Sequence, residues 1–309
     1  MNPKQTLGVI ISNRDFFPDH LVTEARGEIL GLFKKLGITP VILGEKETKL
    51  GGVETHAEAR QCADLFKKHR EELDGILVVL PNFGDEKGVA DTIKLSGLKV
   101  PVLVQAYPDD LKKLDVARRR DGYCGKISVC NNFVQAGIKF TVTRKHVVRP
   151  TDESFITDLK EFLGVCRVVK GLRGLRIGAV GARPGAFNTV RYSEKILERN
   201  GISVTTVDLS EILGKAEKLQ ATDKAVAAKL AEIKSYTPSA GVPQKALEQM
   251  SKMGVILTDW MNTNALDATA IQCWTSVQQN FGCNTCTLMS MMRVRNSCPA
   301  RARWTSPAH

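Results

Sequence analysis

The sequence has no apolar run that approaches the ~20 residues needed for a membrane-spanning helix. We therefore expect neither a membrane span nor a membrane partner. The first residues, MNPKQTLGVIISN, contain only a short apolar stretch and no small-residue cleavage site, which argues against a secretory signal. Eight cysteines without such a signal are typical of reduced thiols, so we expect a cytoplasmic protein.

The short motifs that mark the common cofactor sites are also missing. The segment GAVGARPG (178–185) is neither GxGxxG nor a Walker A loop, which counts against nucleotide binding. The pair CNTC (283–286) has no second CxxC and no nearby histidine, so we expect buried thiols instead of a zinc site. The five histidines are scattered and no Ser-His-Asp arrangement can be assigned. We therefore assign no catalytic residue and no metal ligand.

Acidic residues are too few to balance the basic ones, and the formal net charge is +11. Four of these charges are arginines of the last 17 residues, while most other lysines lie between acids. A nucleic-acid site would need a basic stripe interleaved with aromatic side chains. We interpret the one dense cluster, KKLDVARRR (112–120), as a solvated face or a subunit contact, and leave open an anionic ligand site or a nucleic-acid patch. No nucleic-acid partner is expected.

What the sequence does contain is an alternation of apolar runs and helical segments. The runs TLGVIIS (6–12), ITPVILG (38–44), DGILVVL (74–80) and VPVLVQA (100–106) predict strands, separated by predicted helices over 20–36, 56–72 and 86–96. Strands that are apolar on both faces and alternate with helices predict a parallel sheet covered on both sides. Residues 1–169 are therefore predicted to form an N-terminal α/β domain.

A second alternation follows a bridging helix predicted over 152–169. It has a strand in IGAVGA (177–182), a helix over 188–201, a strand that begins at ISVTTV (202–207), helical sequence to about residue 251, and a strand MGVILTDW (253–260). We predict an incomplete second α/β domain over 170–292. The predicted fold is thus two consecutive doubly wound parallel sheets of Rossmann-like or flavodoxin-like type.

Several loops predicted at the ends of these strands carry unusual side chains. They are SNRDFFPDH (12–20), LPNFGDEKG (80–88), QAYPDD (105–110), GARPGAFN (181–188) and, in a similar place later, TDWMNTNALD (258–267). Ligands of open parallel sheets bind beyond the carboxyl ends of the strands. Amides and guanidinium groups satisfy hydroxyls and aromatic rings cover apolar sugar faces, so these loops suit a polyhydroxylated ligand. The alternative is that the same residues only cap helices and shape turns.

The order of these features resembles the sugar isomerases of the L-fucose and L-arabinose isomerase type, and the fucose branch more closely. The stretches that carry the resemblance lie within 13–26, 80–88, 144–197 and 259–292, so that it spans roughly residues 5–292. The resemblance implies an aldose–ketose isomerase that works through an enediol on Mn²⁺. It also implies two wound N-terminal domains followed by a C-terminal domain, and a homo-oligomer that acts on a monosaccharide.

Five site residues follow from the resemblance. Arg14 corresponds to a sugar-contacting arginine of the first domain, and Phe83, together with Asn82, corresponds to an aromatic contact of that domain. In family members these groups reach the site of a neighbouring subunit. Gln272 and Trp274 lie in the stretch of the second domain that lines the site. We therefore predict substrate binding by all five.

The family pattern stops after TLMSMM (287–292). Family members continue with a segment of the type LP-A-CEVDV-G, whose acids serve the metal, and with a further domain that supplies a histidine ligand. Enediol chemistry needs a Lewis acid and a base. Because the chain shows neither segment as protein, we expect it not to bind Mn²⁺ and not to turn over a sugar.

The last 17 residues, RVRNSCPARARWTSPAH, have no helical or strand periodicity. Trp304 is encoded by TGG and every codon of Thr305 begins with AC, so reading one base earlier gives GAC, an aspartate. With permitted codons, CPARARWTSPAH (298–309) becomes LPGACEVDVTGA in that frame. We interpret 293–309 as an out-of-frame reading that begins just after Met292, the alternative being a basic arm. The gene sequence after the Met292 codon tests this.

Two other functional classes remain open at this point. The two domains could form a sugar-binding or regulatory module that closes on a ligand without chemistry. They could also belong to a nucleotide-sugar enzyme, which the missing phosphate loop disfavours. Saturable sugar binding without turnover would favour the module, and Mn²⁺-dependent turnover would favour a working isomerase.

Overall fold

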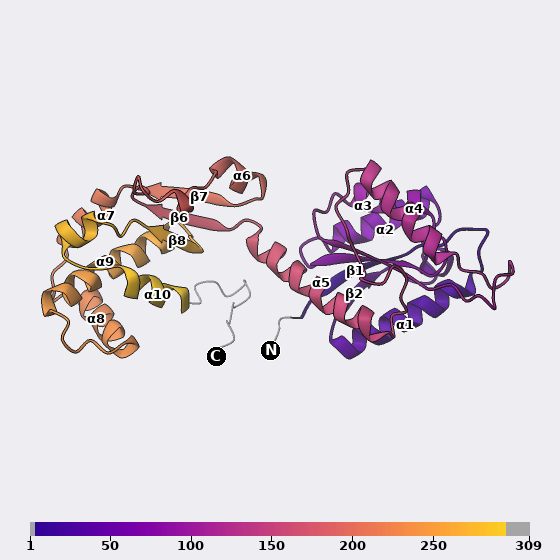
Figure 1. The fold of residues 1–309 in the computed structure, drawn as a ribbon, viewed down its shortest axis with the longest axis horizontal. Helices are drawn as coiled ribbons and strands as arrows, with labels where there is room; N and C mark the ends of the chain where they lie inside the picture. The colour runs from indigo at the N-terminus through magenta and orange to yellow at the C-terminus, as the bar shows by residue number, and fades with distance from the viewer. Residues whose placement is uncertain (1–3, 295–309) are drawn as a thin grey trace. The chain divides into compact units, whose positions relative to one another are not determined.

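The computed structural model describes residues 4–294 (Figure 1). The chain divides into two compact units, Met1–Lys170 and Gly171–His309. Both are α/β with parallel strands, which confirms the predicted fold class. Most of the predicted tail, from residue 295 onwards, lies outside the described residues. Within 4–294, no helix combines the length and apolar character that crossing a bilayer requires.

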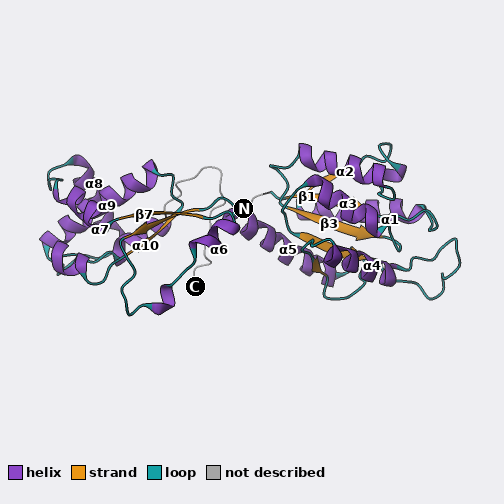
Figure 2. Cartoon of the chain, turned by 90° about the horizontal axis from the view of Figure 1, so that it is seen from above, coloured by secondary structure: helices purple, strands orange, loops and turns teal. Residues whose placement is uncertain are grey.

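The first unit is a five-stranded parallel sheet with the strand order β2-β1-β3-β4-β5. Figures 1 and 2 show its helices on both sides of the sheet. This order is that of the flavodoxin-like doubly wound folds. In chain order its elements are β1 (Thr6–Ile11), α1 (His20–Leu36), β2 (Thr39–Ile42), α2 (His56–Lys68), β3 (Gly75–Leu80), α3 (Glu86–Ser96), β4 (Val102–Ala106), α4 (Gly122–Gln135), β5 (Thr141–Val142) and α5 (Glu153–Leu172).

Two apolar cores, one on each face, hold this sheet. Alternate strand residues point to opposite faces, so in β3 Leu77 and Val79 join one core while Ile76 and Val78 join the other. Helices α1 and α5 pack on the first core, and α2, α3 and α4 pack on the second. This double coverage explains why β3 is apolar at every position from residue 76 to 80.

The second unit is built on a three-stranded parallel sheet of order β7-β6-β8. Its longest helix, α9, is followed after residues 264–267 by the strand β8 and carries much of the core. In chain order its elements are β6 (Arg176–Val180), α6 (Glu194–Arg199), β7 (Ser203–Val207), α7 (Leu209–Glu217), α8 (Lys224–Tyr236), α9 (Gln244–Thr263), β8 (Ala268–Ile271), a single π-turn (Val277–Phe281) and α10 (Cys286–Val294).

Helices α7, α8, α9 and α10 build one apolar core with Val180 and Val207 from one face of this sheet. The other face carries Ile177 of β6 and its register partners Val204 and Ala268, which are half-buried or exposed. The short helix α6 contributes no buried residue. One face of the second sheet therefore remains incompletely covered, and β7 and β8 are both edge strands among the described residues.

This open face is expected to cause self-association, because uncovered apolar sheet faces and free strand edges pair with other chains. Thr206→Lys combined with Ala270→Lys places a charge on each edge strand at exposed positions. We expect this double variant to shift the mass measured by light scattering toward the monomer. Ala228→Lys, which adds charge to an exposed position of α8, serves as the control. An unassociated wild-type chain would contradict the prediction.

Three sequence-based expectations in the second half are wrong. MGVILTDW (253–260) lies inside α9 and is not a strand, because Leu247, Met250, Met253 and Leu257 recur every three or four residues on its buried face. The strand lies later, as β8. Accordingly, TDWMNTNALD (258–267) precedes that strand and does not follow one. The helix predicted over 188–201 shrinks to a short 3-10 turn at 188–190 and the six residues of α6.

Candidate functional site

The carboxyl ends of β1 and β3 form the centre of the candidate site in the first unit. These strands are neighbours, but the chain leaves β1 toward β2 on one side and β3 toward β4 on the other. The loops that follow them diverge at this switch point, where open α/β sheets bind their ligands. Arg14 follows β1, and Asn82 and Phe83 follow β3. The topology thus brings three of the predicted residues together.

Arg14 lies on the ring of Phe83, with its guanidinium carbon 4.4 Å from the ring centroid. Its Nε donates a hydrogen bond of 2.9 Å to the carbonyl oxygen of Gly84. One terminal nitrogen lies 3.4 Å from a carboxylate oxygen of Glu86. The Arg14 side chain is 36% exposed, so it is held in place yet keeps donors that can reach a ligand.

Aromatic rings extend this surface. The ring of Phe17 stacks on Phe83 at a centroid distance of 6.2 Å, and Phe16 meets Phe17 edge-on at 5.5 Å. The guanidinium carbon of Arg119 lies 5.5 Å from the Phe17 centroid. Phe17 is buried and Phe16 is exposed. Sequence reasoning singled out the loop 12–20 but not these individual contacts, which depend on the loop conformation.

Asn82 is buried beneath this surface, and its amide is engaged in internal hydrogen bonds. It donates to the side-chain oxygen of Asn13 at 2.5 Å and accepts from the backbone N–H of Gly84 at 3.0 Å. Asn13 in turn donates to Asp19 and Glu54. In this conformation Asn82 ties the two strand-end loops together, so its predicted contact with a sugar would require the loop to open.

Charged residues lie next to Asn13, the hydrogen-bond partner of Asn82. Burial is the main cause that raises the pKa of the Glu54 carboxyl, although Lys49 lies 3.6 Å away and opposes the rise. The hydrogen bond from Lys49 to Asp19, at 2.9 Å, raises the pKa of the lysine. These ion pairs fix the loop after β1 to the segment after β2.

A second ion network supports the site from the side of β4. Arg120 pairs with Glu24 of α1 at 2.6 Å and donates to the carbonyl oxygen of Pro81 at 2.9 Å. Burial of Glu24 opposes its ionisation, but Arg120 and Arg149 outweigh that effect and lower the pKa of its carboxyl. The interpretation of 112–120 as a solvated cluster is therefore wrong for Arg120, which is buried.

Gln272 and Trp274 occupy the corresponding switch point of the second unit. They follow β8, which neighbours β6, while the chain leaves β6 toward β7 on the opposite side. The Gln272 side-chain oxygen accepts a hydrogen bond of 2.8 Å from the backbone N–H of Ala182, in the loop after β6. Trp274 is 54% exposed and meets the ring of Phe187 edge-on at 5.4 Å. The two predicted residues thus lie beside the loop GARPGAFN.

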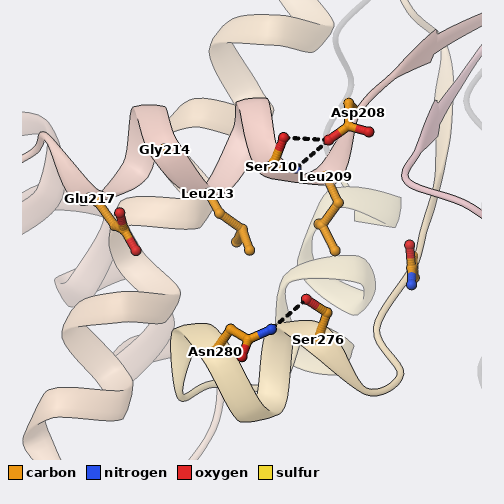
Figure 3. A pocket seen from close by; sticks show the side chains of 9 residues that line it. Asp208, Leu209, Ser210, Leu213, Gly214, Glu217, Ser276 and Asn280 are labelled. Carbon is orange, nitrogen blue, oxygen red and sulfur yellow. Dashed lines mark hydrogen bonds between the residues drawn. The ribbon is translucent and has the colours of Figure 1, made fainter.

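A hollow of about 500 Å³ opens next to Gln272, between α7 and residues 276–280 (Figure 3). Asp208 and Ser210 line one wall, where both the backbone N–H and the hydroxyl of Ser210 donate to Asp208. Ser276 and Asn280 line the other wall and are joined by a hydrogen bond of 2.9 Å. Its polar side chains are mostly satisfied by one another.

The described residues do not fit a Mn²⁺ ion. Within 4–294, no group of three or more His, Cys, Asp or Glu side chains is arranged so that it could hold a metal. The CNTC pair is split: Cys283 is buried, and burial raises the pKa of its thiol to about 11, whereas Cys286 is exposed. The expectation of buried thiols is therefore wrong for Cys286.

A comparison with protein families matches residues 8–173 to the model described as fucose/sulfoquinovose isomerase, N-terminal domain. The match covers more than half of the chain and includes the first sheet, apart from Thr6 and Leu7 of β1, together with Arg14, Asn82 and Phe83. Gln272 and Trp274 lie beyond it. No curated protein matches the chain.

Proposed function

The chain belongs to the fucose/sulfoquinovose isomerase family through its N-terminal domain, and we propose that its strand-end loops bind a monosaccharide. The finer assignment is to the aldose–ketose isomerases of the L-fucose type. Within that assignment, Arg14 and Phe83 are sugar-binding residues of the first unit, and Gln272 and Trp274 are sugar-binding residues of the second.

The observation that carries this proposal is the contact of Arg14 with Phe83 at the switch point of the first sheet. A guanidinium group offers donors to several hydroxyls, and a ring beside it covers the apolar face of a pyranose or open-chain sugar. The carbonyl of Gly84 and the carboxylate of Glu86 orient Arg14 before any ligand arrives. Such preorganisation lowers the cost of binding.

Replacing Arg14 by alanine should weaken the binding of L-fucose by about tenfold or more, because hydrogen bonds from a charged group contribute strongly. Isothermal titration calorimetry on the full chain measures the effect. Arg60→Ala is the matched control, since Arg60 is an exposed arginine of α2 in the same unit. Equal loss of affinity in both variants, or none in Arg14→Ala, would contradict the assignment.

We further propose that the 309-residue chain binds the sugar without converting it. Enediol formation needs a Lewis acid and a base at C1 and C2, and within 4–294 no group of three or more His, Cys, Asp or Glu side chains could hold the metal. The expected result is saturable binding with no aldose–ketose interconversion after Mn²⁺ is added. Exchange of the C2 proton with solvent, followed by NMR, is the sensitive measurement, and Mn²⁺-dependent exchange would refute this.

A further inference from the structure

Glu86 is the first residue of helix α3 and follows Phe83 by three residues. It is not among the five predicted site residues. Its side chain is 34% exposed, and its Oε2 lies 3.4 Å from Nη2 of Arg14. A carboxylate therefore stands beside the arginine that is central to the proposed sugar site.

Two side chains hold the same oxygen of this carboxylate. Oε2 faces Nη2 of Arg14 and also accepts a hydrogen bond from the hydroxyl of Ser128, which lies on α4. Across the described residues, Oε1 accepts no hydrogen bond from the protein. Because the side chain is partly exposed, Oε1 can accept a hydrogen bond from a ligand.

Arg14 and Glu86 together offer complementary groups to a sugar. Nε of Arg14 is bound to the carbonyl oxygen of Gly84, so the terminal nitrogens supply the donors and Oε1 of Glu86 supplies the acceptor. A hydroxyl group both donates and accepts hydrogen bonds. Two neighbouring hydroxyls therefore match a guanidinium and a carboxylate that lie side by side, while the ring of Phe83 covers an apolar sugar face.

The same pair determines which charge the site accepts. Glu86 balances the charge of Arg14. An anionic substituent placed against Arg14 would also lie close to the Glu86 carboxylate, and the two like charges would repel each other. A neutral sugar avoids this cost. Binding sites often select a ligand in this way, by repelling the wrong one as well as attracting the right one.

We propose that Glu86 is a specificity-determining residue of the sugar site: its Oε1 accepts a hydrogen bond from a sugar hydroxyl, and its charge keeps anionic groups away from Arg14. This rests on the proposed function and narrows it to sugars that are neutral where they meet Arg14. Ser128 and Arg14 hold the carboxylate in place before the sugar binds, which lowers the cost of binding.

The test removes the charge of Glu86 and keeps its shape. The full chain and its Glu86→Gln variant are titrated calorimetrically with two pairs of sugars that differ in charge at C6, D-galactose with D-galacturonate and quinovose with sulfoquinovose. All titrations use one ionic strength, because salt screens charges. We expect the wild type to bind the neutral sugar of a pair more tightly. In Glu86→Gln, this preference should fall by about tenfold or more in at least one pair.

Two further variants identify the cause of the change. Asp64→Asn removes the charge of an exposed aspartate of α2 and should leave the preference as in the wild type. Adding Arg14→Ala to Glu86→Gln should abolish the gain for the anionic sugar, because the unbalanced cation is then gone. Circular dichroism establishes that the variants fold.

A purely structural role of Glu86 would weaken the binding of all four sugars equally. An unchanged preference in both pairs therefore overturns the inference, although the proposed function stands because sugars bind. A wild type that prefers the anionic sugars overturns the inference in the same way. If neither L-fucose nor any of the four sugars binds to the wild type, the proposed function fails and the inference fails with it.

Discussion

Gly125→Ala is expected to lower the free energy of unfolding of the first unit by about 3 kcal/mol or more, at the upper end of overpacking effects. Gly125 lies in the first turn of α4, directly against the loop after β3. A Cβ atom there would lie 2.2 Å from the carbonyl oxygen of Phe83 and 2.6 Å from its Cα. Backbone atoms cannot yield as a flexible side chain does, so the helix or the site loop must move.

The chain offers an internal control for this experiment. Gly31→Ala also changes a helical glycine, but its Cβ would meet nothing within 4 Å, so we expect unchanged or slightly higher stability. All three tryptophans lie after residue 259. Their fluorescence therefore reports on the second unit, while hydrogen exchange of β1 and β3 reports on the first.

In urea, Gly125→Ala should lower the protection of β1 and β3 against hydrogen exchange. The unfolding transition followed by tryptophan fluorescence should stay at the same urea concentration. It should also weaken sugar binding, because Phe83 cannot keep its position. Equal stability of the Gly125→Ala and Gly31→Ala variants would show that α4 does not press on the loop as described.

The first sheet could be predicted from sequence because its strands are apolar on both faces and its helices have clear ends. Helix 20–36 ends at Gly37, which adopts a left-handed conformation, and helix 86–96 ends at Gly97 in the same way. The last strand of the second half was predicted in the wrong place, and the reason is physical. Strand β8 (ATAI) is short and half-exposed, whereas the apolar run of α9 is longer and imitates a buried strand.

The candidate site was only partly predictable. The loop sequences showed which residue types follow the strands, but the meeting of Arg14 with Phe83 depends on the strand order, which periodicity does not specify. The burial of Asn82 and Arg120 could likewise not be predicted from the sequence, since polar side chains in loops normally face solvent. Both are held inside by partners distant in sequence, Asn13 and Glu24.

Helix α4 was not predicted, and it contains a fully buried lysine. Lys126 donates to the hydroxyl of Thr143 at 2.6 Å and to the carbonyl oxygen of His146 at 2.7 Å. These bonds tie α4 to the segment that follows β5. Burial lowers the pKa of Lys126 to about 8, and the charges of Cys130 and Asp158 oppose this only partly. His146 faces the same region, with its ring 4.3 Å from that of Tyr123.

The pKa of Lys126 gives the first unit a defined pH dependence. The pKa is lower in the folded state than the ordinary value of 10.5, so between about pH 8 and 10.5 the unfolded chain binds a proton that the folded chain does not. Stability must therefore rise with pH through this window, and the cost of burying the charge is fully present below it. The gain is at most about 3 kcal/mol.

Buried thiols change the stability in the opposite direction as the pH rises. Measurements on the wild-type protein alone would therefore not reveal the gain from Lys126. Burial raises the pKa of the Cys166 thiol to about 12, compared with about 9 in the unfolded chain. As the pH rises above 9, the contribution of this thiol therefore makes the folded state less stable. Cys130 behaves in the same direction. The informative quantity is consequently the difference in unfolding free energy between the wild type and Lys126→Met. The contribution of Cys166 cancels in this difference, whereas that of Cys130 cancels only in part, because the charge of Lys126 lowers the pKa of Cys130.

We expect this difference to change in favour of the wild type by up to about 3 kcal/mol between pH 7.5 and 10.5. Lys126→Met keeps the volume and removes the titrating group. Hydrogen exchange of the backbone amides of β4 and α4 measures the unfolding free energy of the first unit, once it is corrected for the intrinsic effect of pH on the exchange rate. Lys94→Met, at an exposed lysine of α3, should give a difference that is flat with pH. If the difference in unfolding free energy for Lys126→Met were also flat with pH, Lys126 would have an ordinary pKa. Its amine would then have to be in contact with water.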